Sequence, residues 1–209
     1  TGTLPKFEAW VSTNGDDSTG VVGNRDMPFA TATGAIQAIE SLNSGSSAGS
    51  IIYLFEGEHS LSNGEWFTPT TVGEWLTIRR DQNARRNHTI IDDFGSLIYT
   101  DLIKIESVTL KNQSGGDRLI YNEPVLVWLD DVYIIGSGQH ITNSNPFFRP
   151  NGDSFVTDTY MFDVDFGMHR GNLARNVTIE KVGNDPFVNV FLMANVRAIN
   201  VDPGPDTYW

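Results

Sequence analysis

The sequence predicts an all-β solenoid of stacked coils that begins with one short helix. Three observations predict this fold class: one helical periodicity near the N-terminus, short segments rich in Ile, Val, Thr, Phe and Tyr over the rest of the chain, and a repeated pattern in the later segments. The 209 residues are sufficient for one domain with a hydrophobic core. We expect residues 1–50 to form an entry strand, a loop and the helix, and residues 51–209 to form the β coils.

The predicted helix lies between Thr31, which has the side chain of an N-cap, and a loop rich in Gly and Ser. Its apolar side chains recur at helical spacing and therefore share one face: Ala32, Ala35, Ile36, Ile39 and Leu42. No later segment of the sequence has this periodicity in convincing form. The rest of the chain is therefore predicted to be strands and turns.

After the helix, short apolar segments are separated by Gly, Asn, Asp and Pro, which are typical of turns. The clearest segments predicted as strands are Ile51–Phe55, Trp75–Arg79, His88–Ile91, Ser96–Tyr99 and Leu102–Leu110. The alternative is an antiparallel sandwich, in which Asn-Gly pairs would mark the hairpins between strands. The Asn-Gly pairs of this sequence fall in loops, so the pattern favours a solenoid.

A small polar residue directly before Val recurs in the later segments: Ser107-Val108, Asp131-Val132, Asn176-Val177 and Asn195-Val196. The intervals between these valines are 24, 45 and 19 residues. If the long interval contains one more unit, carried by Phe155-Val156 or by residues 161–166, the period is about 19–24 residues. Coils of that length bury their apolar faces by stacking, and each strand pairs with the coils above and below it.

The N-terminal part of the chain also carries a family resemblance, which lies in residues 9–20, in Met27-Pro28-Phe29-Ala30-Thr31 and in residues 35–39. These stretches resemble the entry of right-handed parallel β-helix proteins of the pectate-lyase-like superfamily. In that family, a strand that ends in a Gly-Asp turn is followed by a Pro-Phe-x-Thr segment and a short helix that caps the open end of the coil. Residues 51–57 are similar to the family's first coil, and residues 76–79 and 88–92 to its next. The resemblance implies a right-handed parallel β-helix with a short N-terminal capping helix.

The superfamily includes polysaccharide lyases, glycoside hydrolases, phage tailspikes and non-catalytic virion or surface proteins. The resemblance therefore implies two kinds of function. The first is an extracellular, cell-surface or virion-associated protein that binds a polysaccharide and, as a lyase or glycoside hydrolase, depolymerises it. The second is a non-catalytic structural or adhesive module of a phage tail, virion or bacterial surface. A homotrimer is common among β-helix tailspikes, so a second expected partner is a further copy or a further segment of the same protein.

Composition excludes several other classes. The chain has 14 Lys and Arg against 26 Asp and Glu, a net charge of −12, so a phosphate backbone would be repelled and nucleic acid is not an expected partner. Cysteine is absent, which excludes disulfides, thiolate zinc sites and a Cys nucleophile. No apolar stretch approaches the ~18–20 residues that cross a bilayer, so no membrane insertion is expected. The final Thr207-Tyr208-Trp209 is similar to the start of another strand, and we expect the natural chain to continue.

The predicted catalytic residues begin with Asp163 and Asp165, which flank Val164. In a regular strand these two side chains point to the same side, about 6.5–7 Å apart along the chain. That separation is near the lower end of the ~6.5–9.5 Å range of inverting glycosidases, where one carboxyl is the acid and the other activates water. The pair is equally suited to Ca²⁺, the one cofactor that the sequence indicates. The alternative is an ordinary half-buried strand whose aspartates face solvent.

His169 and Arg170 follow this strand and complete the predicted catalytic set, because an imidazole can transfer a proton and a guanidinium can bind a sugar carboxylate. In the lyases of the superfamily, a basic residue abstracts the proton α to a uronate while Ca²⁺ and further basic residues neutralise the acid. The resemblance therefore implies this role for Arg170 or Lys181. The spacing of these residues favours neither of them.

The predicted substrate-binding residues are basic or aromatic: Trp66, Arg79, Arg80, Arg85, Arg86 and Arg175. Four of these arginines lie in residues 79–86, the basic run, which offers a sulfated or uronic-acid polymer its best electrostatic contact on an acidic chain. The alternative for the run is a solvated loop. Trp66 lies between strands, where an exposed indole can stack on a sugar ring, whereas Trp75 and Trp128 lie in apolar runs and are expected to pack.

Overall fold

The computed structural model describes the two sheets of the coil stack and the N-terminal segment. The described residues are 5–61, 69–71, 73–92, 102–111, 121–122, 126–136, 149–150, 154–164, 168–182 and 187–201. Within the strands, residues 121–122, 149–150, 154, 168–171, 182, 187–189 and 201 are described by their backbone alone.

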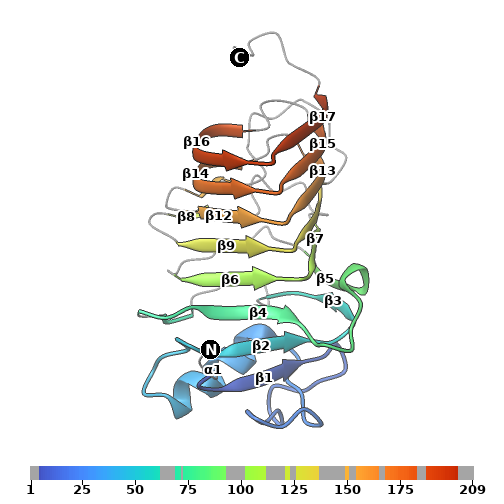
Figure 1. Cartoon of the computed structure of the whole chain (residues 1–209). Helices are drawn as coiled ribbons and strands as arrows, with labels where there is room; N and C mark the ends of the chain where they lie inside the picture. The colour runs from blue at the N-terminus through green and yellow to red at the C-terminus, as the bar shows by residue number, and fades with distance from the viewer. Residues whose placement is uncertain are drawn as a thin grey trace.

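The strands form a right-handed parallel β-helix, which confirms the predicted fold class (Figure 1). Sheet A contains, in spatial order, β1 (Glu8–Val11), β2 (Ile51–Leu54), β4 (Leu76–Arg80), β6 (Ile103–Glu106), β9 (Val127–Asp130), β12 (Ser154–Thr157), β14 (Met168–Arg175) and β16 (Phe187–Ala194). Sheet B contains β3 (Gly57–His59), β5 (Thr89–Asp92), β7 (Thr109–Lys111), β10 (Tyr133–Ile135), β13 (Tyr160–Val164), β15 (Thr178–Val182) and β17 (Arg197–Val201). A short third sheet pairs β8 (Tyr121–Asn122) with β11 (Arg149–Pro150), and a 3-10 helix, η1, spans Arg86–His88.

The N-terminal segment closes one end of the stack with the predicted helix, α1 (Ala32–Leu42). Thr31 is its N-cap, and the Thr31 hydroxyl accepts a hydrogen bond from the Gly34 amide at 2.9 Å. The Asp17 carboxylate in turn accepts from the amides of Ala30 and Thr31 and from the Thr31 hydroxyl. The loop that contains Asp17 therefore anchors the helix start, and the apolar face of α1 packs into the core.

The core consists of side chains that stack coil upon coil. In sheet A, one column of inward residues runs in register from β1 to β14, and each member is fully buried: Ala9, Ile52, Ile78, Ile105, Leu129, Val156 and Ala174. The matching inward residues of sheet B are His59, Ile91, Leu110, Ile134, Met161 and Ile179. Each large aliphatic side chain buried in this way stabilises the fold by about 1.5–3 kcal/mol before entropy is counted.

The repeated polar residue marks the corner between sheets A and B. At this corner the backbone is left-handed, with φ between 51° and 56°, at Ser107, Asp131, Asp158, Asn176 and Asn195. Asn and Asp tolerate this conformation better than bulky residues because their short side chains hydrogen-bond locally. The following residue then turns into the core. Asp158 begins the additional unit predicted within the 45-residue interval, with Thr159 in the place of Val.

The strands predicted at residues 51–55, 75–79 and 88–91 correspond to β2, β4 and β5 within one residue at either end, and one other predicted strand is divided in two. Residues 102–110 were predicted as one strand but form β6 and β7, because Ser107 adopts φ 56° and turns the chain between the sheets. The strand predicted at 96–99 lies outside the described residues. The number of residues per coil also varies. Leu76 of β4 lies in register with Ile103 of β6, whereas Phe155 of β12 lies in register with Leu173 of β14, so the later coil is the shorter of the two.

Candidate functional site

The outer face of sheet A carries an aromatic row that runs over successive coils. Alternation along the strands sends Trp128, Phe155, Leu173 and Leu192 outward in direct register from β9 to β16. Trp75 lies beside them, and its ring meets that of Trp128 edge-on with centroids 6.0 Å apart. We call these five residues the aromatic row. Trp75 and Trp128 are predicted to pack, and they do so against each other, but on the outer face, where both are half-buried because the core positions alternate with theirs.

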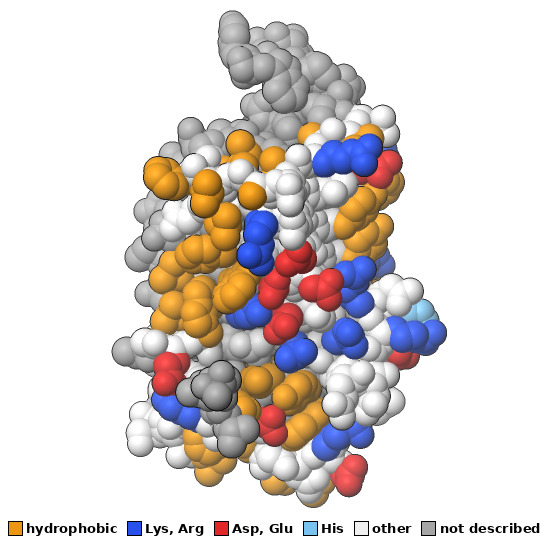
Figure 2. Space-filling model, in the orientation of Figure 1, with side chains coloured by type: hydrophobic (Ala, Val, Ile, Leu, Met, Phe, Trp, Pro, Cys, Tyr) orange, Lys and Arg blue, Asp and Glu red, His pale blue; other side chains and the backbone are white. Residues whose placement is uncertain are grey.

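A polar row lies next to the aromatic row, nearer the corner between the sheets. Its members are also in register, one per strand from β4 to β14: Arg79, Glu106, Asp130, Thr157 and Arg175. Figure 2 shows the hydrophobic side chains of this face gathered on one side and the acidic and basic side chains gathered beside them. The face therefore offers apolar rings and hydrogen-bonding groups in parallel along the helix axis.

Lys104 connects the two rows. Its Nζ lies 2.8 Å from Asp130 Oδ2 and 3.5 Å from Glu106 Oε2, and 4.2 Å from the centroid of the Trp128 ring. The Trp128 indole N–H donates to the Thr157 hydroxyl at 2.8 Å, and that hydroxyl donates to Asp130 Oδ1 at 2.6 Å. The Trp128 ring is thus fixed in orientation by Thr157 and Lys104.

The Asp130 carboxylate is ionised throughout the neutral pH range. Partial burial raises its pKa, but the hydrogen bonds from Lys104 and Thr157 more than offset this effect, so the pKa lies below its ordinary value of 3.8. An ionised carboxylate accepts hydrogen bonds only. Asp130 is therefore a fixed acceptor on this face rather than a proton donor.

Two further aromatic rings extend the polar row toward the N-terminus. Tyr53 and Trp10 precede Arg79 in the same register column, and their rings stack with centroids 5.1 Å apart. The Trp10 indole N–H donates to Asp81 Oδ2 at 3.1 Å, and Arg25 forms a salt bridge to the other Asp81 oxygen at 3.0 Å. These contacts hold the N-terminal loop against the first coils.

The basic residues predicted to bind substrate are all engaged within the chain. Arg79 lies 3.7 Å from Glu106, and Arg175 lies 3.8 Å from Asp158. The other three use the following acceptors: Arg80 donates to the Ala84 carbonyl at 2.7 Å, Arg85 binds Glu56 through two nitrogens at 2.9 and 3.2 Å, and Arg86 pairs with Asp131. Arg85 lowers the pKa of Glu56 to about 2. Arg79, Arg85 and Arg86 therefore link coils through ion pairs, whereas Arg80 binds a carbonyl within its own loop.

The predicted catalytic set is described only in part. Asp163 adopts φ 56°, and its strand does not alternate regularly: Phe162 and Asp163 are half-buried while Val164 is buried. The expectation of a regular strand here was wrong, because one left-handed residue shifts the following side chains to the other face. Asp163 pairs with Lys181 at 2.9 Å.

The remaining predicted residues stay predictions. Asp165 and Trp66 lie outside the described residues. His169 and Arg170 lie in the first half of β14, at positions where the structure describes the backbone alone. Among the described residues, no group of three or more His, Asp or Glu is arranged to hold a metal ion, so the expected Ca²⁺ has no described ligand set.

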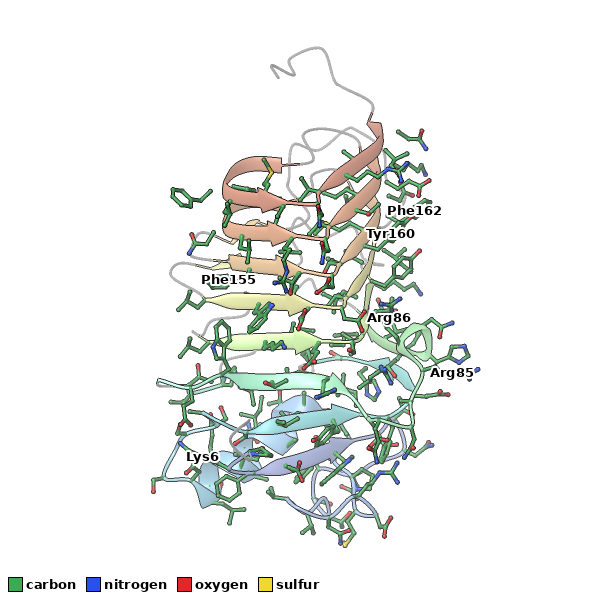
Figure 3. The ribbon with its side chains drawn as sticks, viewed as in Figure 1. Lys6, Arg85, Arg86, Phe155, Tyr160 and Phe162 are labelled. Atoms are coloured by element: carbon green, nitrogen blue, oxygen red, sulfur yellow. The ribbon has the colours of Figure 1, made fainter. Side chains whose placement is uncertain are left out.

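Sheet B carries a second group of aromatic side chains on its own outer face. Tyr133 and Tyr160 stack with ring centroids 5.0 Å apart. The Tyr160 hydroxyl donates to Glu180, which raises the pKa of Tyr160 to about 12. Figure 3 shows Phe155 on sheet A, and Tyr160 and Phe162 projecting from sheet B on another side of the molecule. The two aromatic groups are therefore separate surfaces.

Comparison with protein-family models, with curated proteins and with solved structures finds no match for this chain. None of the helices in the described ranges is both long and apolar enough to cross a membrane. The class of protein that fold and site define is thus a parallel β-helix with an aromatic row and a polar row on the outer face of sheet A.

Proposed function

We propose that this chain is an extracellular, cell-surface or virion-associated β-helix, of the pectate-lyase-like superfamily, that binds a polysaccharide on the outer face of sheet A. The observation that carries the proposal is the aromatic row beside the polar row, both in register over successive coils. Aromatic faces stack on the C–H faces of sugar rings, and charged or amide groups bind sugar hydroxyls.

The repetition of the two rows favours a polymer over a single small molecule. Neighbouring strands lie about 4.8 Å apart, so successive coils from β9 to β16 present an apolar side chain at a short, regular step, aromatic on β9 and β12 and leucine on β14 and β16. A chain of repeated sugar units can use such contacts one after another, and modest affinities at each step combine. Trp128 and Phe155, adjacent in register, lie at the centre of this surface.

Binding is tested by electrophoresis in native gels that contain soluble polysaccharides, with Trp128→Ala and Phe155→Ala variants beside the wild type. We expect each variant to lose about tenfold in affinity for the retarding polymer, or ~1.4 kcal/mol. Tyr133→Ala is the matched control, because Tyr133 is a half-exposed aromatic residue on sheet B. Equal losses in all three variants, with native circular dichroism, would refute binding on sheet A.

Depolymerisation is a separate part of the proposal. If Asp163 and Asp165 act as an acid and base pair, with His169 and Arg170 beside them, the chain should release reducing ends or unsaturated sugars from the polymer that it binds. Replacing both aspartates by Asn should then abolish turnover without abolishing retention in the gel. Full turnover in the double variant would remove these residues from the mechanism.

The second candidate is a non-catalytic structural or adhesive module that assembles with further copies of itself. The observation in its favour is the exposure of large apolar side chains on β16, where Phe191 is 91%, Leu192 56% and Met193 49% exposed. Exposed apolar groups of this size are typical of interaction surfaces. Light scattering decides this candidate: a stable trimer supports it, and a monomer at micromolar concentration contradicts it.

A further inference from the structure

We infer that the polysaccharide bound on sheet A is uncharged. This inference rests on the proposed function and specifies its ligand class. It differs from the expectation, based on the basic run of the sequence, that a sulfated or uronic-acid polymer is bound.

The charges on this face are compensated within the chain. The cations of the two rows and their neighbours are Lys104, Arg79 and Arg175, and the carboxylates paired with them are Asp130, Glu106 and Asp158. Each cation has a carboxylate oxygen within 4 Å, and the numbers of positive and negative groups are equal. These three cations therefore present no uncompensated positive charge to a polyanion, and the guanidinium of Arg80, beside Arg79, is held by the Ala84 carbonyl.

Lys104 is the cation least able to change partners. Its side chain is only 16% exposed, and Asp130 and Glu106, its partners, are 21% and 22% exposed. Moving the ammonium group to a ligand would leave the partly desolvated Asp130 carboxylate without a cation and Glu106 with Arg79 alone, which is unfavourable. The same ammonium group also lies over the Trp128 ring. Lys104 thus stabilises the site instead of serving as an anion receptor.

The charge of the whole chain acts in the same direction. A net charge of −12 repels a polyanion at long range and slows its approach. It would attract a polycation, but a cationic polymer would meet the same paired carboxylates and compete with Lys104 and Arg175 for them. An uncharged polymer needs no such exchange: its hydroxyls can donate to Asp130 and accept from Arg175 while the ion pairs remain intact.

The experiment compares matched polymers with wild-type protein. Several neutral polysaccharides are each tested beside a carboxylated and an aminated derivative of the same backbone, by calorimetry at two salt concentrations about tenfold apart. We expect a neutral parent to bind, with a Kd that changes less than about twofold between the two salt concentrations. At the higher salt concentration, both charged derivatives should bind at least about tenfold more weakly than their neutral parent.

The outcomes separate the inference from the proposed function. Tighter binding of a charged derivative, with an affinity that falls steeply as salt rises, overturns the inference but leaves polysaccharide binding in place. Binding of a neutral parent that is unaffected by both Trp128→Ala and Phe155→Ala overturns the assignment to sheet A. If no neutral or charged polymer binds, the proposed function fails and the inference fails with it.

Discussion

The corner residue Asn176 provides the sharpest test of how the repeat forms the coils. Its backbone has φ 53°, its Nδ2 donates to Asp158 Oδ1 at 2.7 Å, and its Oδ1 accepts from Asn195 Nδ2 at 3.1 Å. Replacement by Ala removes both hydrogen bonds and leaves in the left-handed region a residue whose side chain cannot hydrogen-bond locally. The strain costs about 1–2 kcal/mol and each exposed bond about 0.5 kcal/mol, so we expect Asn176→Ala to lose about 2 kcal/mol of stability.

Asn176→Gly separates the backbone contribution from the hydrogen bonds. Glycine adopts positive φ without strain, although its flexibility in the unfolded chain costs about 0.5–1 kcal/mol. Both variants lose the same side-chain bonds, so the glycine variant should be the more stable of the two by about 0.5–1 kcal/mol. Urea unfolding followed by tryptophan fluorescence measures both. An alanine variant as stable as the glycine variant would refute the left-handed corner.

Three further predictions concern the core and two ionisable groups. Leu129→Ala removes a fully buried side chain stacked between neighbouring coils and should destabilise the fold by about 2–5 kcal/mol, measured as a lower urea midpoint with an unchanged slope. Burial lowers the pKa of His59 below 6.5, so the folded state binds this proton less tightly than the unfolded state. The free energy of unfolding should therefore decrease as the pH falls below 6.5, and His59→Phe should remove that part of the decrease. Arg85 lowers the pKa of Glu56 from 4.5 to about 2, so the stabilisation by this pair is complete above pH 4.5 and is lost toward pH 2. Glu56→Gln should therefore lose less stability than the wild type across that pH range. A variant whose stability depends on acid pH as the wild type's does would contradict the ion pair.

Local signals were sufficient to predict the helix and the repeat. Thr31 and the apolar spacing after it define α1 because capping and periodicity act within a few residues. The polar residue before Val predicted the repeat, since a short polar side chain suits the left-handed corner that the coils from β6 onward share. The sequence does not show that this residue ends one strand and begins the next, so its pattern predicts a single strand over residues 102–110 where the structure has β6 and β7.

The surface rows were not predictable in the same way, because they depend on register between distant strands. Trp128, Phe155 and Leu173 are neighbours only because coils of different length bring them into one column. The partners of the basic run are likewise far away in sequence: Arg86 pairs with Asp131, and Arg85 with Glu56. The left-handed Asp163 is a further case, since nothing in an alternating sequence indicates where a strand will shift its face.

The structure of the chain with an oligosaccharide cut from a neutral polymer that it binds is the most direct test of the central claim. The account predicts sugar rings stacked on Trp128 and Phe155, with hydroxyls bonded to Asp130 or Arg175 and the Lys104 ion pairs intact. Sugar bound on the Tyr133 and Tyr160 face of sheet B, or an acidic sugar held by a displaced Lys104, would contradict it.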